Sequence, residues 1–188
     1  MSKIIFKETD IKDLYIIEIE KHEDERGYFA RAWCQKEFEN VELCGNLVQC
    51  NLSHNKKMGT IRGLHFQKKP FSEIKLVRCV KGKIFDVAVD LREESETYGQ
   101  WFGIELSEEN GTALYIPEGC AHGYQVLVDD SIVFYQVSEY YTPNSESGIL
   151  WSDEALNIQW PLNENVIISE KDQNLPKIKQ LISKKIEI

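Results

Sequence analysis

The chain has 188 residues, of which 42% are hydrophobic and 28% charged, and its formal net charge is −9. These proportions are ordinary for a globular protein, and the acidic balance argues against non-specific binding to nucleic acid. No apolar run approaches the roughly 20 residues needed to cross a bilayer, and Lys3 and Lys7 interrupt the N-terminus too early for a signal peptide. The sequence therefore predicts one domain over residues 1–188, with no membrane segment.

Five cysteines, at positions 34, 44, 50, 79 and 120, are spread along the chain. Their number is odd, and they contain no Cys-x-x-Cys pair. This pattern favours reduced thiols and a cytoplasmic location over a disulfide scaffold or a zinc site.

Short runs rich in Val, Ile, Phe and Tyr recur along the chain, broken by Gly, Pro, Asn and Asp, which is typical of strands. In chain order the expected strands are Tyr15–Glu18, Leu47–Ser53, Gly59–Phe66, Ile74–Val80, Lys83–Leu91, Trp101–Leu106, Ala113–Ile116, Gly123–Val128 and Ile132–Glu139. Lys81-Gly82 and Asp129–Ser131 indicate tight turns. Many short strands joined in this way predict an antiparallel sandwich or barrel.

Helices are expected to be few and short. Gln35–Glu39 and Asp153–Asn157 each suit one or two turns. A C-terminal helix is predicted near 177–184, with Ile178 and Leu181 on one face.

The strand Lys83–Leu91 predicts two different faces. Alternation places Val87 and Val89 on a core face, and Asp86 and Asp90 on the other. Carboxylates among small residues suit the lining of a barrel mouth.

Two of the four histidines stand in settings that suggest chemistry. His65 follows Arg62-Gly63, and Lys75 lies one strand away, so a base and two cations can converge. His122 follows Pro117-x-Gly119-x-x, a stiff turn that aims its side chain; the alternative is a buried structural histidine. The other two, His22 and His54, lie among polar residues and are expected to be exposed.

The sequence lacks the residue patterns expected for metal-dependent, nucleophilic or dinucleotide-dependent catalysis. A catalytic zinc or iron site needs about three protein ligands, and without His-x-His the set is short. Asp86 or Glu73 would have to complete it, and neither has ligand spacing, so no metal is predicted. A Gly-x-Ser-x-Gly elbow and a dinucleotide fingerprint are also missing. Proton transfer remains, with a histidine base, a tyrosine acid, a lysine for an oxyanion and arginines for phosphate.

A series of short motifs then occurs in a fixed order between Asp24 and Pro176. They are Asp24-Glu25-Arg26-Gly27-x-Phe29, Gln49-x-Asn51-x-Ser53-x-Asn55, Gly59-Thr60-Ile61-Arg62-Gly63-Leu64-His65, Lys75-Leu76-Val77-Arg78, Phe85-Asp86-Val87-Ala88-Val89-Asp90, Ile116-Pro117-x-Gly119-x-Ala121-His122-Gly123, Tyr135, Tyr140-Tyr141-x-Pro143, Trp160-Pro161 and Ser169-x-Lys171-Asp172. Together they resemble the dTDP-4-dehydrorhamnose 3,5-epimerase family of RmlC-like cupin nucleotide-sugar epimerases. The resemblance implies a mainly β fold: a cupin-type antiparallel β-barrel (jelly roll) with a few short peripheral helices.

The resemblance also implies an activity and a catalytic set. The protein would be a cofactor-independent epimerase that inverts C3, C5 or both in a nucleotide-linked 4-keto-6-deoxy-hexose, for deoxysugar and cell-surface polysaccharide biosynthesis. His65 would be the general base, oriented by Asp172. Lys75 would stabilise the enolate at the C4 oxygen, and Tyr135 would return a proton from the opposite face.

The same resemblance implies a substrate-binding set and a homodimer. Arg62 would hold the diphosphate, and Arg26 and Phe29 would reach the nucleotide from a neighbouring subunit. The full set implied to bind substrate is Arg26, Phe29, Arg31, Gln49, Asn51, Arg62, His122, Tyr141 and Glu146.

Arg31 departs from the family pattern, which has a glutamate able to accept a hydrogen bond from thymine. An arginine only donates, so it suits an acceptor edge such as that of cytosine, unless it pairs with a nearby carboxylate or phosphate. The same chemistry on a CDP-linked sugar is therefore an alternative, as is inversion of a single carbon. Alternatives of another class are a metal-dependent cupin and a non-catalytic sugar-binding cupin.

Overall fold

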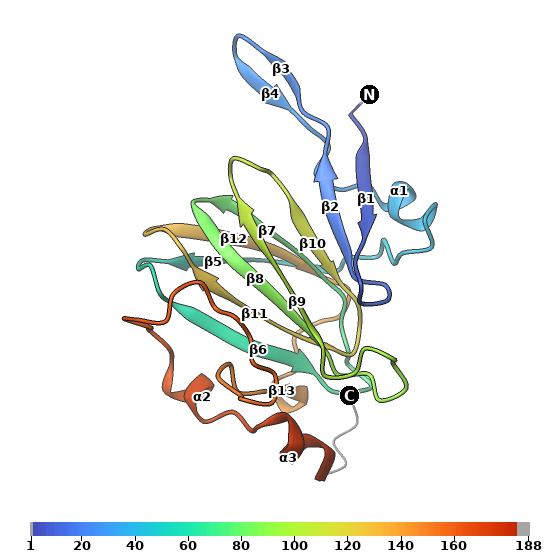
Figure 1. Ribbon diagram of the computed structural model, residues 1–188. Helices are drawn as coiled ribbons and strands as arrows, with labels where there is room; N and C mark the ends of the chain where they lie inside the picture. Colours follow the sequence, from blue (N-terminus) through green and yellow to red (C-terminus); the bar gives the residue numbers. More distant parts are fainter. Residues whose placement is uncertain (1, 184–188) are drawn as a thin grey trace.

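The computed structural model describes residues 2–183, and antiparallel strands dominate it (Figure 1). A six-stranded sheet has the spatial order β1 (Ile4–Glu8), β2 (Tyr15–Ile19), β10 (Ala113–Ile116), β7 (Lys75–Lys81), β12 (Ser131–Val137) and β5 (Gln49–Asn55). A five-stranded sheet has the order β13 (Glu146–Gly148), β6 (Ile61–Gln67), β11 (Cys120–Val126), β8 (Lys83–Asp90) and β9 (Trp101–Ser107).

The inner faces of the two sheets share one apolar core. Val77 and Val133 from the six-stranded sheet pack in the same cluster as Ile84, Ala88 and Val126 from the five-stranded sheet. All five side chains are almost completely excluded from solvent, which is the main favourable contribution to folding. The result is the predicted jelly-roll barrel.

The outer face of the five-stranded sheet is covered by the C-terminal part of the chain. Leu64 and Val89 from the sheet pack against Ile149, Trp160 and Leu181. Both faces of β8 are consequently buried. Asp86 and Asp90 do not line an open barrel mouth, because both are fully buried and bound to basic partners.

The outer face of the six-stranded sheet is covered only in part. Phe38 of α1 (Gln35–Glu39) is fully buried there, with its ring 5.0 Å from that of Phe6 and 5.7 Å from that of Tyr115. Farther along the sheet the apolar side chains are uncovered: Leu52 of β5 is 71% exposed and Val80 of β7 is 44% exposed.

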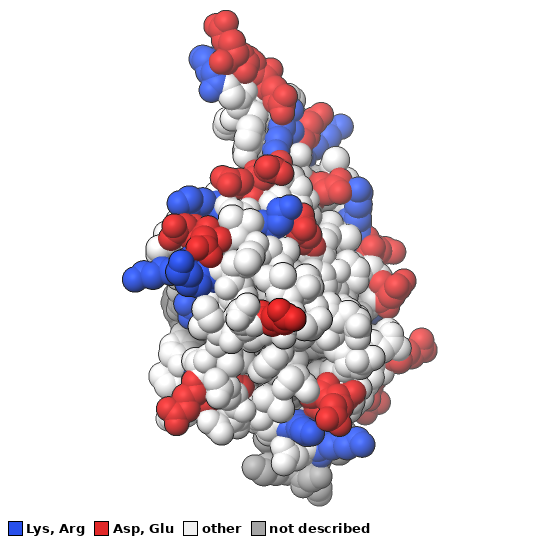
Figure 2. Space-filling model, turned by 60° about the vertical axis from the view of Figure 1, so that its left-hand side comes forward, with Lys and Arg blue, Asp and Glu red and all other residues white. Residues whose placement is uncertain are grey.

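A two-stranded hairpin, β3 (His22–Asp24) and β4 (Gly27–Phe29), projects from the barrel (Figure 1). Both of its strands are exposed along their length. Figure 2 shows charged side chains of both signs at the projecting end and few charges over the middle of that face. The hairpin has no core of its own and no cover within the described residues.

The expected strands all occur, with bounds shifted by a few residues, and the Lys81-Gly82 turn joins β7 to β8. One shift matters for the site. His122 was expected in the turn before a strand, but β11 begins at Cys120, because that segment already pairs with β8. The sequence patterns missed β1, the β3–β4 hairpin and β13.

The helices follow the predictions less closely. Gln35–Glu39 is helical as expected, whereas Asp153–Asn157 is a single hydrogen-bonded turn. The C-terminal helix is α3 (Ile178–Ser183); the predicted end at Lys184 lies outside the described residues. A short helix, α2 (Glu170–Gln173), was not expected. Within residues 2–183, no helix combines the length and apolarity required to span a membrane.

Candidate active site

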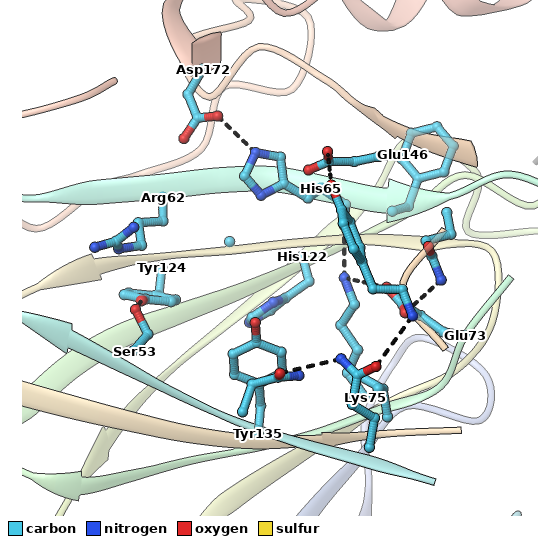
Figure 3. Close-up of a pocket in the computed structure, with 17 residues that line it drawn as sticks. Ser53, Arg62, His65, Glu73, Lys75, His122, Tyr124, Tyr135, Glu146 and Asp172 are labelled. Carbon is cyan, nitrogen blue, oxygen red and sulfur yellow. Dashed lines mark hydrogen bonds and ion pairs between the residues drawn. The ribbon is translucent and has the colours of Figure 1, made fainter. Parts of the chain in front are cut away.

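A cavity of about 420 Å³ opens between the two sheets (Figure 3). Its wall comes mainly from β5, β6, β7, β11 and β12. The lining residues are Gln49, Asn51, Ser53, Arg62, His65, Phe66, Gln67, Glu73, Lys75, His122, Gly123, Tyr124, Tyr135, Val137, Tyr141, Glu146 and Asp172. The four residues expected to be catalytic are therefore together, and six of the nine expected to bind substrate accompany them.

His65 and Asp172 form a hydrogen-bonded pair at one side of the cavity. The Nε2 atom of His65 lies 2.7 Å from Oδ1 of Asp172. The His65 side chain is 29% exposed, whereas that of Asp172 is only 6% exposed. The imidazole thus faces the cavity with a carboxylate behind it, which fixes the orientation of the ring.

Local structure places the Asp172 carboxylate. Ser169 caps α2, and its Oγ accepts a hydrogen bond from the backbone N–H of Asp172. The second carboxylate oxygen accepts the backbone N–H of Gly63 at 3.2 Å. Burial by itself raises the pKa of Asp172, but the bonds from His65 and Gly63 outweigh it, so the pKa lies below its ordinary value.

Gly63 is required where β6 and β11 come together. Its φ is +110°, and a Cβ at this position would lie 2.6 Å from the carbonyl oxygen of His122. No side chain fits such an approach. The glycine therefore lets β6 carry His65 alongside His122, its Cα partner on β11.

Lys75 reaches the same cavity from β7 on the opposite sheet. Its Nζ donates to the carbonyl oxygen of His65 at 3.1 Å and lies 3.1 Å from Oε1 of Glu73. An ammonium has three N–H donors, so one remains for a substrate oxygen. The side chain is only 9% exposed, and a charge in such a site acts more strongly than it would in water.

Tyr135 faces the cavity from β12, across from His65 (Figure 3). Burial, followed by the negative charge of Glu73, raises the pKa of its phenol. Tyr135 therefore holds its proton at neutral pH and can act as an acid.

His122 has a buried partner of its own. Its Nε2 lies 2.8 Å from Oδ1 of Asp86, whose other oxygen is buried without a hydrogen bond among the described residues. Burial raises the pKa of Asp86. Both expectations for His122 are therefore met in part: it is a buried, hydrogen-bonded histidine, and it also lines the cavity.

Two polar clusters flank these groups. In one, Asn55 accepts a 2.7 Å hydrogen bond from Nε of Arg62, and Tyr124 donates to Ser53 at 2.9 Å. In the other, Glu146 accepts from Tyr141 at 2.8 Å and lies 2.6 Å from Nζ of Lys171. In the first cluster Arg62 remains exposed and can bind an anion. In the second, the ion pair between Glu146 and Lys171 connects β13 to α2.

Three residues expected to bind substrate do not line the cavity: Arg26, Phe29 and Arg31. Arg26 and Phe29 lie on the exposed hairpin, and Phe29 is 71% exposed. Arg31 forms an ion pair with Glu37 of α1, so the alternative of a nearby carboxylate partner is the one observed.

Sequence patterns missed Ser53, Gln67, Glu73 and Tyr124 as site residues. Strand alternation carries the signal for Tyr124, which lies two residues after His122, but only once His122 is placed inside a strand. Gln67 shares a face with His65 in the same way. Residues 2–183 contain no cluster of three or more histidine, cysteine, aspartate or glutamate side chains suited to a metal ion.

Comparison with known proteins agrees with this geometry. A family model described as dTDP-4-dehydrorhamnose 3,5-epimerase matches residues 8–180. The chain belongs to this family. The resemblance drawn from the motifs is thus confirmed.

Individual members of the family match over nearly their whole length. The dTDP-4-dehydrorhamnose 3,5-epimerase of Shigella flexneri is 47% identical over 167 residues, 88% of this chain and 91% of the relative. The crystal structure of the Elizabethkingia anophelis enzyme has a TM-score of 0.91 at 44% identity, covering 94% of this chain and 97% of the other. A dTDP-6-deoxy-D-glucose-3,5-epimerase from Legionella pneumophila, in complex with dTDP-4-keto-L-rhamnose, has a TM-score of 0.91 at 38% identity and covers 100% and 98%.

Proposed function

We propose that the protein is a 3,5-epimerase that converts dTDP-4-dehydro-6-deoxyglucose to dTDP-4-dehydrorhamnose, a step of deoxysugar and cell-surface polysaccharide biosynthesis. The observation that carries the proposal is the His65–Asp172 pair, which opens onto one cavity with Lys75 and Tyr135. Family membership and the Legionella complex supply the substrate class.

The chemistry starts with a proton beside the ketone. C3 and C5 both neighbour the C4 carbonyl, so the same site can act on each in turn. His65 removes the proton. The electron pair of the broken C–H bond forms a double bond to C4, and the carbonyl electrons move onto O4 to give an enolate. Asp172, buried behind the imidazole, stabilises the imidazolium that forms.

Lys75 and Tyr135 complete the inversion. The remaining N–H of Lys75 donates to O4 as negative charge develops on that oxygen. This hydrogen bond lowers the barrier because it is stronger in the transition state than in the bound substrate. Tyr135, on the facing sheet, protonates the carbon from the opposite side. Solvent then returns a proton to Tyr135 and removes one from His65, so no cofactor is consumed.

The identity of the nucleotide is inferred from the family and from the position of Arg31. The case for CDP depended on an arginine facing the base, and Arg31 is instead bound to Glu37 outside the cavity. The bound nucleotide sugar of the Legionella relative supports dTDP. Arg62 lines the cavity and is exposed, which supports its proposed role in holding the diphosphate.

A homodimer would place the hairpin over a neighbouring site. The uncovered side chains Leu52 and Val80 provide an apolar face for a second copy, and Phe29 is an exposed aromatic residue of the kind that anchors in a partner's pocket. Light scattering on the purified protein tests this: twice the monomer mass supports it, and a monomer at all concentrations contradicts it. Five unpaired thiols favour the cytoplasm as the location.

Solvent deuterium incorporation into dTDP-4-dehydro-6-deoxyglucose tests the function. Exchange at C3 and C5 with formation of the rhamno product supports the double epimerase, and exchange at one carbon alone would make it a single-centre enzyme. No exchange with the dTDP or the CDP sugar would contradict the proposal and favour a binding protein. Activity that is lost to a chelator and restored by a metal would support a metal-dependent cupin.

A further inference from the structure

Glu73 is a charged residue of the cavity wall to which the proposed reaction assigns no role. It lies two residues before Lys75, where β7 begins, and its side chain is only 11% exposed. An ionised carboxylate is rarely buried without strong partners. Its position beside Lys75 is visible in Figure 3.

Both carboxylate oxygens of Glu73 are engaged. Oε1 lies 3.1 Å from Nζ of Lys75, and Oε2 accepts a 2.9 Å hydrogen bond from Nε2 of Gln67. Together with the bond from Lys75 to the His65 carbonyl, this directs two of the three ammonium donors. The direction of the third N–H of Lys75 is then fixed by the tetrahedral geometry of the ammonium, because the other two N–H groups are already bound.

Gln67 extends this connection to the segment that carries Tyr141. Its Nε2 also lies 3.2 Å from the carbonyl oxygen of Tyr140, and its Oε1 accepts the backbone N–H of Thr142 at 2.6 Å. Gln67 is buried, so these bonds are shielded from water. One amide therefore joins the Lys75–Glu73 pair to the loop beside the cavity.

We propose that Glu73 is a positioning residue for catalysis: it holds the Lys75 ammonium so that one N–H points at the C4 oxygen, and it links that ammonium through Gln67 to the Tyr140–Thr142 loop. The inference deepens the proposed epimerase function and rests on it. A lysine on an unrestrained four-carbon stem would sample several positions, and a misplacement of about 1 Å can cost on the order of 10² in rate.

Glu73 has a second consequence, for Tyr135. Its negative charge is the largest effect on the pKa of Tyr135 after burial, and both raise it. The other charged groups acting on that phenol are Arg62, which lowers the pKa, and Glu146, which raises it. Removing the charge of Glu73 should therefore lower the pKa of Tyr135 and bring the alkaline loss of activity to lower pH.

The test compares Glu73→Gln, Glu73→Asp and the control Glu118→Gln, which removes an exposed carboxylate that Ser72 contacts outside the cavity. For Glu73→Gln, kcat should fall about 10²-fold, with KM within about threefold of the wild-type value. The alkaline limb of the pH profile, where activity is lost as pH rises, should move to lower pH. For Glu73→Asp, which keeps the charge but shortens the reach, kcat should fall about 10-fold with the limb unmoved. Glu118→Gln should match the wild type.

A double-mutant cycle with Lys75→Ala separates positioning from a structural effect. If Glu73 acts through Lys75, adding Glu73→Gln to Lys75→Ala should cost less than threefold more in kcat. Full additivity, or wild-type activity in both Glu73 variants with an unmoved alkaline limb, would overturn the inference. An inactive wild type would instead contradict the proposed function itself. Circular dichroism of each variant identifies any that do not fold. Glu73→Asp, which retains the negative charge, provides a second variant if Glu73→Gln does not fold.

Discussion

The barrel cavity and the β3–β4 hairpin hold two groups of residues for which the sequence predicted a role, and they differ in how far the folded chain prepares them. In the cavity, His65 is bound to Asp172 of α2, and Lys75 of β7 is bound to the carbonyl oxygen of His65 and to Glu73. On the hairpin, Arg26 and Phe29 are exposed and contact none of the cavity. Under the proposed function, proton transfer would be organised within one chain, whereas the proposed nucleotide contacts of the hairpin would need a second copy.

The largest expected effect lies in the cavity. His65→Ala should reduce epimerisation by at least about 10³-fold and abolish deuterium exchange at C3 and C5, because it removes the proposed general base. Tyr135→Phe is the matched variant: it should also stop inversion but retain exchange, since the base still removes and returns a proton on its own face. Mass spectrometry and NMR of the product distinguish the two. Equal loss of exchange in both variants would contradict the separation of base and acid.

The next effect concerns the stability of the barrel. Burial raises the pKa of Asp90, but bonds from Arg92, Ser95 and Thr97 outweigh it and lower the pKa to about 2. A lowered pKa stabilises the fold above the unfolded value of 3.8, and that stabilisation is lost as pH falls toward 2. Asp90→Asn should therefore reduce the free energy of unfolding by on the order of 2 kcal/mol at pH 7.

Urea unfolding at pH 7, 5 and 3 measures this difference for Asp90→Asn, with the exposed Asp10→Asn as control. The difference in free energy of unfolding between Asp90→Asn and wild type should be smaller at the lowest pH. The control Asp10→Asn should not differ from wild type at any of the three pH values. A gap that stays constant with pH would mean that packing, and not charge, carries the effect.

A smaller effect is expected on the hairpin. Phe29→Ala should raise KM about 10-fold with kcat within about threefold, because it removes an anchor for the nucleotide and leaves the cavity intact. Tyr28→Ala, on the other face of the same strand and under Lys21, is the matched control. Steady-state kinetics of both variants test the idea. Equal KM values for Phe29→Ala and wild type would remove the hairpin from the binding site.

The smallest effect should come from Arg31→Ala. The Arg31–Glu37 ion pair is partly exposed, and screening by solvent keeps its contribution to stability small. We expect KM for the dTDP sugar to change less than threefold and dTDP to remain a better competitor than CDP. A variant that loses a CDP preference present in the wild type would show that Arg31 does contact the base.

Local patterns predicted the barrel better than its edges. Alternating apolar residues predicted strands such as β8 and β12, because packing between two sheets imposes a period of two. They missed the β3–β4 hairpin, since its strands are exposed on both faces and carry no such alternation. They also misplaced the start of β11, where pairing with β8 extends the strand back to Cys120.

By itself the sequence determined the repeating strand pattern and the family, and it singled out the side chains proposed as acid and base, because these depend on residue type and order. Only the tertiary structure decided which groups meet. The family resemblance implied the pairing of Asp172 with His65, and the structure shows it across 107 positions of the chain. No pattern indicated that Glu73 binds Lys75 through one oxygen and Gln67 through the other, or that Glu37 is the partner of Arg31. Such contacts depend on how the sheets pack and where α2 docks, and no local pattern in the chain encodes those distances.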